Sequence, residues 1–101
     1  MAHVVVLGAG VAGVTSAYAL KSRLGDADRV SLVSDKPYFQ FAPSNPWLAM
    51  GWRARKDIAF PIGPYLNERG IDFHASAVKA LHPRRSAVQL VDGTELGYDI
   101  L

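Results

Sequence analysis

The sequence HVVVLGAGVAG, residues 3–13, decides the fold of this chain. It begins with a short apolar run rich in β-branched side chains, which predicts a buried strand, and a G-x-G-x-x-G pattern then opens an apolar helical stretch. We expect Gly8 to permit the tight turn, Gly10 to let the backbone approach a phosphate, and Gly13 to let helix and strand pack closely. The pattern predicts that a dinucleotide pyrophosphate lies at this helix N-terminus. The predicted binding residues are Gly8, Ala9, Gly10, Val11, Ala12 and Gly13.

The sequence predicts a β-α-β unit around this turn. Apolar residues recur at helical spacing over 11–24, Gly25 is a typical helix stop, and 29–33 is a second apolar strand. A unit of this length joins two parallel strands through a right-handed crossover, as one half of a dinucleotide-binding domain requires.

The end of the second strand departs from the usual dinucleotide pattern. An acidic residue normally accepts hydrogen bonds from the adenosine ribose there, but Ser34 occupies the position and Asp35 comes one residue later. Two interpretations remain open. Ser34 and Asp35 bind the ribose, or they form a capped strand end followed by a polar turn.

A long connection rich in proline and aromatic residues fills residues 36–63. Connections of this length in small domains are functional or disordered, and the many apolar side chains argue against disorder. Ser44 or Asn45 is a suitable N-cap for a short helical turn over 47–50. The segment either borders a flat ring such as an isoalloxazine, or packs its aromatic side chains as a lid over the sheet edge. The side chains concerned are Tyr38, Phe39, Phe41 and Trp47.

The remainder of the chain continues the α/β pattern and then changes character. Residues 64–69 predict a short helix and 71–74 a third parallel strand. Three strand-like runs separated by turn residues then predict an antiparallel meander over 78–101. Its last four residues begin another apolar strand in which the sequence stops, so we expect a piece of a larger protein.

These elements define the expected fold class. It is an α/β, Rossmann-like half-domain over 1–101, with a parallel three-layer β-α-β core, an antiparallel meander and a truncated last strand.

Composition narrows the function further. The formal net charge of +2 is too small to indicate nucleic acid, and we interpret the basic clusters at 53–56 and 84–85 as solvated surface. No apolar run could span a bilayer, and we expect no signal peptide, because the first strand follows Met1 within two residues. We therefore expect a cytoplasmic protein, or one peripheral to the inner membrane.

The chain contains no cysteine, so it holds no disulfide, no thiolate metal site and no thiol redox chemistry of its own. Its three histidines, His3, His74 and His82, show no ligand spacing. We expect no metal site and no catalytic residue in these 101 residues.

Several motifs together resemble the N-terminal part of sulfide:quinone oxidoreductases. They are the glycine turn, the loop YFQFAPSNPW at 38–47, DIAFPI at 57–62 and the closing pattern DGT…YDIL. The loop is the specific part of this resemblance. The enzymes it points to are flavoproteins with two dinucleotide-binding domains, in the pyridine nucleotide-disulfide oxidoreductase family.

The resemblance implies an FAD cofactor in the parent protein. It places the pyrophosphate on the glycine turn, the ribose near Ser34, and the flavin against Pro43, Ser44 and Asn45. The parent would oxidise sulfide through cysteines beyond residue 101 and pass electrons through FAD to quinone, at a membrane surface with which it associates peripherally. We expect the 101-residue chain itself to be inactive, to bind at most the ADP part of FAD or none, and to pair its exposed sheet edges in a homodimer.

Three alternatives remain beside this interpretation. The first is part of a type II NADH:quinone dehydrogenase, which shares the FAD half. The second is a non-catalytic dinucleotide-binding module. In the third, Lys36 binds the 2′-phosphate of NADP, because Ser34 is not acidic.

Overall fold

Three parallel strands form the centre of the molecule, which the computed structural model describes over all residues, 1–101. They are β1 (His3–Leu7), β2 (Arg29–Ser34) and β5 (Asp72–Ala75), in the spatial order β1-β2-β5. Val4 pairs with Val30 and Leu32 pairs with Phe73, both in parallel register. The carboxyl ends of all three strands therefore meet at one edge of the sheet.

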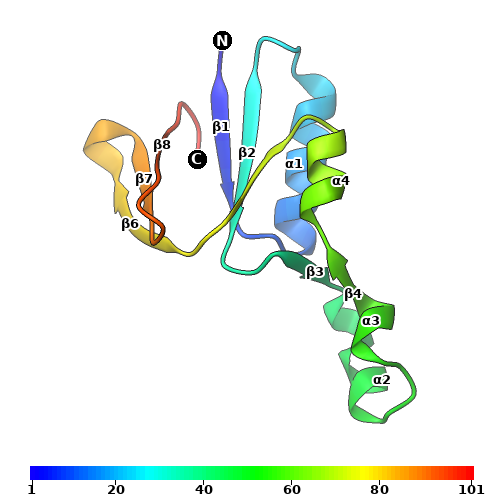
Figure 1. Cartoon of the computed structure of the whole chain (residues 1–101). Helices are drawn as coiled ribbons and strands as arrows, with labels where there is room; N and C mark the ends of the chain where they lie inside the picture. Colours follow the sequence, from blue (N-terminus) through cyan, green and yellow to red (C-terminus); the bar gives the residue numbers. More distant parts are fainter.

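Helices cover one face of this sheet and a second sheet covers the other (Figure 1). The helices are α1 (Val11–Arg23) and α4 (Gly63–Glu68). The second sheet is an antiparallel meander of β6 (Val78–His82), β7 (Ala87–Leu90) and β8 (Glu95–Gly97), with a 3₁₀ turn η2 (Pro83–Arg85) between its first two strands. The expected α/β fold, with a parallel core and an antiparallel meander, is confirmed.

Strand β2 supplies side chains to two separate apolar cores. Val30 and Leu32 face the helices, where they pack with Ala17 and Leu66. Val33 belongs to the cluster on the opposite face, whose other members come from β1 and the meander. This alternation follows from the two-residue period of a strand, and each buried aliphatic side chain contributes about 1.5–3 kcal/mol.

The last residues return to the first strand. Val5 N–H donates to the Ile100 carbonyl (2.9 Å) and Asp99 N–H donates to the His3 carbonyl (2.8 Å), so that Val4 and Ile100 form an isolated parallel bridge. The last part of the predicted meander is thus divided. Its first part, β8, pairs with β7, and its end begins a new parallel partner of β1.

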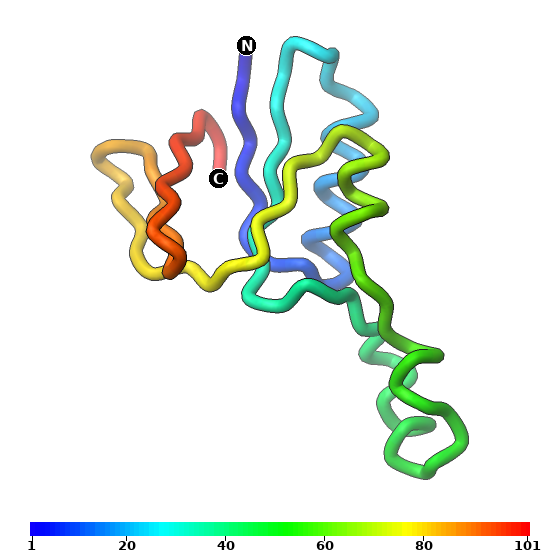
Figure 2. Tube along the Cα trace, in the orientation of Figure 1, coloured from blue at the N-terminus to red at the C-terminus, as the bar shows by residue number.

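Residues 38–61, which we call the arm, project from the body of the molecule (Figure 2). A short antiparallel pair forms the base of the arm, and three short helical segments form its tip. These elements are β3 (Tyr38–Gln40), η1 (Ala42–Ser44), α2 (Asn45–Ala49), α3 (Arg55–Ile58) and β4 (Ala59–Pro61). The arm raises the radius of gyration to 14.9 Å, against about 13 Å for a compact domain of this length.

Three details differ from the sequence-based expectations. The lid interpretation is wrong for Phe41 and Trp47, which lie exposed on the arm, whereas Phe39 does pack against the helix-side core. Helix α1 ends at Arg23, one residue short of the expected 24, with Leu24 in extended backbone and Gly25 following as the expected stop without a positive φ. Helix α4 begins one residue early, at Gly63.

None of the helices has the length and apolar character to cross a bilayer.

Candidate dinucleotide site

The turn between β1 and α1 is built around glycine. Gly8 has a φ of 108°, which L side chains rarely adopt, and its N–H donates to the Val33 carbonyl (2.7 Å). A Cβ on Gly13 would lie 1.9 Å from the Gly8 carbonyl oxygen, so only glycine lets helix and turn approach this closely. A Cβ on Gly10 would meet nothing within 4 Å. The space beside Gly10 is therefore open to a ligand.

The N-terminus of α1 is left uncapped. Gly10 is the N-cap residue and offers no side chain, the first turn contains no acidic residue, and the first N–H bonded to the cap carbonyl is that of Val14 (3.0 Å). The earlier N–H groups of a helix have no intrahelical partner, and they carry the positive end of the helix dipole, about half an elementary charge. The turn thus presents free donors and positive potential, which suit a phosphate group.

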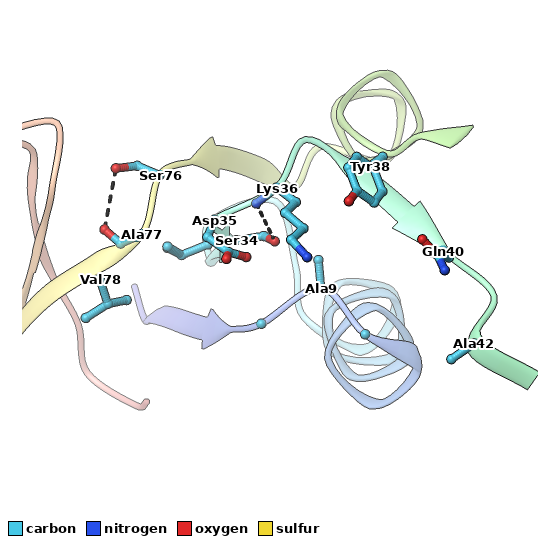
Figure 3. A pocket seen from close by; sticks show the side chains of 13 residues that line it. Ala9, Ser34, Asp35, Lys36, Tyr38, Gln40, Ala42, Ser76, Ala77 and Val78 are labelled. Atoms are coloured by element: carbon cyan, nitrogen blue, oxygen red, sulfur yellow. Dashed lines mark hydrogen bonds between the residues drawn. The ribbon is translucent and has the colours of Figure 1, made fainter. Parts of the chain in front are cut away.

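Next to this helix N-terminus, Gly8, Ala9 and Gly10 line a cavity of about 610 Å³ at the carboxyl edge of the parallel sheet. Residues 8–10 lie at one side, residues 33–36 form the end of β2 and the turn after it, and residues 76–78 lead from β5 into β6 (Figure 3). The base of the arm closes the remaining side with Tyr38, Gln40 and Ala42. A crevice outside the carboxyl ends of parallel strands is the usual ligand position in open α/β sheets.

The end of β2 forms the capped turn that one interpretation expected, while contact with a ribose stays a prediction. Ser34 Oγ accepts a hydrogen bond from the Lys36 N–H (3.2 Å), so the serine does cap the turn. Ser34 and Asp35 also line the cavity, where the serine hydroxyl can still donate and the carboxylate can accept. Figure 3 shows the Lys36 side chain extending toward Ala9. This cation lies on the same cavity wall as the one carboxylate.

The cavity gathers only some of the residues that the sequence singled out. Gly8, Ala9, Gly10, Ser34 and Asp35 line it, whereas Val11, Ala12, Gly13, Pro43, Ser44 and Asn45 lie outside its walls. Ser44 is buried, and its Oγ accepts a hydrogen bond from Arg53 Nη1 (2.8 Å). Asn45 Oδ1 accepts one from Gln40 Nε2 (2.8 Å). Both side chains therefore hold the arm together.

Sequence reasoning missed the wall formed by Ser76, Ala77 and Val78. The signal was present, because the carboxyl ends of predicted parallel strands share an edge and a third such strand was expected just before Ser76. The turn after β7 fixes this wall. Asp92 N–H donates to Ser76 Oγ (3.2 Å) and Val91 N–H donates to the Ala77 carbonyl (2.9 Å). Tyr38 belongs to the aromatic set that the sequence analysis named as bordering a ring or forming a lid, whereas Gln40 was not singled out.

The groups with shifted pKa values lie outside the cavity walls. His3 is the first residue of β1, and its Nε2 lies 2.8 Å from Oγ of Ser31 in β2. Burial and the nearby Arg29 guanidinium lower the pKa of His3. Hydrogen bonds with Thr94 lower the pKa of the exposed Asp92. No group of three histidine or acidic side chains is arranged to hold a metal ion. The cavity therefore contains no group with a shifted pKa and no metal cluster. Its backbone donors and few charges are features of a ligand-binding site.

Comparison with known proteins gives a family resemblance for this site. No family model matches the chain. The chain is 40% identical over 99 residues to the sulfide-quinone reductase of Aquifex aeolicus (strain VF5), in an alignment that covers 98% of this chain and 23% of the relative. The solved structure of the sulfide:quinone oxidoreductase from Aquifex aeolicus matches with a TM-score of 0.93 and 38% identity, over 98% of this chain and 23% of that one.

A more distant structure shares the fold alone. The NAD-dependent persulfide reductase from A. fulgidus matches with a TM-score of 0.84 and 22% identity, over 96% of this chain and 20% of that one. The present chain thus spans less than a quarter of the length of these proteins. It has a Rossmann-like α/β fold, and its expected resemblance to part of a sulfide:quinone oxidoreductase is confirmed over nearly its whole length.

Proposed function

We propose that this chain forms the ADP-binding half of the FAD site in a sulfide:quinone oxidoreductase. The observation that carries the proposal is the uncapped glycine turn, which opens into a cavity of about 610 Å³ at the carboxyl edge of the parallel sheet. The 40% identity to the Aquifex sulfide-quinone reductase supplies the reaction class.

The pyrophosphate binds where the backbone donors are free. In this proposal Gly8, Ala9 and Gly10 approach the phosphates directly, because no Cβ fills the space beside Gly10. Val11 and Ala12 contribute through the N–H groups of the first helical turn, and the role of Gly13 is to bring that turn close to the strand. Lys36 adds a positive charge at the same rim.

The adenosine part lies across the ends of the sheet. Ser34 and Asp35 offer a hydroxyl and a carboxylate to the ribose. The wall at 76–78 faces them across the ends of the strands and offers apolar side chains and backbone polar groups to the adenine ring. The flavin end then extends past Ala42 toward Pro43, Ser44 and Asn45. Since the last two side chains are already hydrogen bonded within the arm, this segment contacts the ring through backbone and the proline ring.

The whole protein would oxidise sulfide and reduce quinone. FAD supplies two-electron transfer chemistry when it is bound, and the residues described here hold and orient its ADP end. The chain has no cysteine to take part in sulfide chemistry. We therefore expect the 101 residues alone to give no sulfide-dependent quinone reduction. We further propose peripheral membrane association for the whole protein, and a homodimer for the chain, because β5 has no partner on its outer side.

Calorimetric titration of the chain with ADP, FAD, NADH and NADPH tests the proposal. We expect ADP and FAD to bind weakly and within about tenfold of each other, because most contacts are with the ADP half, and a tenfold difference corresponds to about 1.4 kcal/mol. Gly10→Asp should abolish binding by placing a carboxylate in the open space beside the phosphates. Gly25→Ala, in an equally open position away from the cavity, is the matched control.

Two outcomes would contradict the proposal. One is ADP binding that Gly10→Asp leaves unchanged. The other is much tighter binding of NADPH than of ADP, which Lys36→Gln reduces to the ADP level. That second result would support the NADP alternative.

A further inference from the structure

One turn of the meander is fastened to the wall of the cavity. The turn joins β7 to β8 at residues 91–94, and it lies beside the segment that leads from β5 into β6 (Figure 1). Asp92 N–H donates to Ser76 Oγ (3.2 Å), and Val91 N–H donates to the Ala77 carbonyl (2.9 Å). Two adjacent residues of the turn thus each make one hydrogen bond to the wall.

The Asp92 carboxylate keeps this turn in shape. Its Oδ1 accepts a hydrogen bond from the Thr94 N–H (2.9 Å), as aspartate commonly does two residues ahead of a backbone donor in a turn. Leu90 N–H donates to the Thr94 carbonyl (2.8 Å), and Gly93 N–H donates to the Leu90 carbonyl (3.1 Å). Gly93 has a φ of 94°, which favours glycine. The carboxylate therefore closes a tight turn and orients the N–H groups at its start.

The wall has almost nothing else to hold it. Ser76 and Ala77 lie between β5 and β6 and belong to neither strand. Apart from a contact of 3.5 Å between Ser76 Oγ and the Ala77 carbonyl (Figure 3), the two bonds from the turn are the only hydrogen bonds that these residues make. Their own N–H groups donate to no group of the chain, and both residues line the cavity. The position of these donors therefore depends on the turn.

We propose that Asp92 is a positioning residue for the adenine end of the dinucleotide site. Asp92 lies outside the cavity walls and acts through the turn, which sets the place of Ser76 and Ala77. This role rests on the proposed function, because that function places the adenine ring at residues 76–78. A backbone N–H bonds a ring nitrogen well only at about 2.7–3.2 Å and nearly in line, so a small displacement of the wall lowers the affinity for the base.

Hydrogen exchange of the ligand-free chain tests the first step. In Asp92→Ala the Val91 amide should exchange about fivefold faster, because loss of one hydrogen bond in the turn raises the locally open population by that factor. Asp92→Asn keeps an oxygen acceptor for the Thr94 N–H and should restore the rate. An unchanged Val91 rate in Asp92→Ala, or no rescue by asparagine, would overturn the positioning role.

Titration with ADP and with inorganic pyrophosphate, followed by NMR of the backbone amides, tests the second step. ADP should shift the Ser76 and Ala77 signals, and Asp92→Ala should weaken ADP binding about fivefold. Pyrophosphate has no base, so its binding should stay the same. Glu95→Gln is the matched control, because it also removes one carboxylate from this hairpin, where Glu95 pairs with Arg85 (3.4 Å). It should leave both affinities unchanged.

A double variant tests whether the wall and the turn act as one unit. Ser76→Ala removes the acceptor of the Asp92 N–H and should weaken ADP binding about as much as Asp92→Ala does. The two changes combined should cost no more than either alone. Losses that simply add would show that the two residues act separately, which would contradict the positioning role. Circular dichroism establishes that each variant is folded.

Failure of this role is distinct from failure of the proposed function. ADP that shifts neither Ser76 nor Ala77, or whose affinity is the same in Asp92→Ala, would overturn the role of Asp92. Shifts at residues 8–10 in the same titration would leave the phosphate site standing. ADP binding that survives Gly10→Asp contradicts the proposed function, whereas the exchange rates of the ligand-free chain do not depend on that result.

Discussion

The body and the arm of this molecule are held in different ways. In the body, β2 is buried from Val30 to Val33 and lies between two apolar clusters. In the arm only Ser44 and Ile58 are buried, and the tip is held by local hydrogen bonds and cation–aromatic contacts. Burial of apolar side chains thus stabilises the parallel sheet that borders the cavity. The arm depends on hydrogen bonds and cation–aromatic contacts that contribute about 1 kcal/mol each. The body provides a rigid binding edge, and the arm a surface that can open locally.

The largest loss of stability is expected for a substitution in the glycine turn of the body. Gly13→Val should cost about 3 kcal/mol or more of the free energy of unfolding, because its Cβ would lie 1.9 Å from backbone that cannot move without separating β1 from α1. Urea denaturation measures the loss. Gly25→Ala, with free space around it, should change stability by less than about 0.5 kcal/mol. A stable Gly13→Val variant would mean that the close approach of helix and turn is not required.

A matched leucine pair compares the two regions directly. Leu32→Ala should lower the free energy of unfolding by about 2–5 kcal/mol, since Leu32 is fully buried and leaves a cavity. Leu48→Ala in the arm, where the side chain is only half-buried, should cost less than about 1 kcal/mol. Urea midpoints with unchanged m-values are the measurement. Equal losses at both positions would show that the arm belongs to the same cooperative core.

A smaller effect is expected within the arm itself. Arg53→Ala removes the hydrogen bond to buried Ser44 Oγ and the contact with the Trp47 ring. Hydrogen exchange of the α2 amides should then speed up about fivefold, because a local loss of about 1 kcal/mol raises the open population by that factor. The global free energy of unfolding should stay the same. Arg84→Ala is the control, and slowing or no change in α2 would contradict the prediction.

The smallest predicted effect acts on the body through pH. The pKa of His3 in the folded chain lies below 6.5 because of burial and Arg29, so the unfolded chain takes up this proton first as the pH falls. Stability from His3 is therefore complete above pH 6.5 and declines below it, until the pKa of the folded state is passed. Denaturation of the chain and of His3→Gln at several pH values isolates this contribution. If His3→Gln and the unsubstituted chain show the same pH dependence of stability, His3 makes no such contribution.

Much of the body could be predicted because its signals are local. The β-branched run gives β1 its bounds, and the helical spacing ends α1 one residue from the expected position. The glycine positions predicted the turn, and the parallel order of β1 and β2 brought Ser34 and Asp35 to the same edge. Their contact with a nucleotide stays a prediction.

The arm could not be predicted in the same way. Aromatic side chains indicate that a segment contacts something apolar, but not whether that partner is the chain's own sheet or another surface. Phe39 packs against the helix-side core, while Phe41 and Trp47 are exposed. The wall at 76–78 had a sequence signal in the expected strand before it, but the long-range hydrogen bonds from the meander turn to Ser76 and Ala77 had none.

The return of the last residues to β1 has a consequence for the order of folding. His3 N–H donates to Asp99 Oδ2 (2.7 Å) across a sequence separation of 96, and the neighbouring backbone bonds with Ile100 join residues about as remote in sequence. Contacts this remote in sequence carry the largest loop-closure entropy, so they form after the local β-α-β unit. We therefore expect the chain ends to come together late in folding, when the last residues pair with β1. Energy transfer between dyes on Met1 and Leu101 would report that pairing.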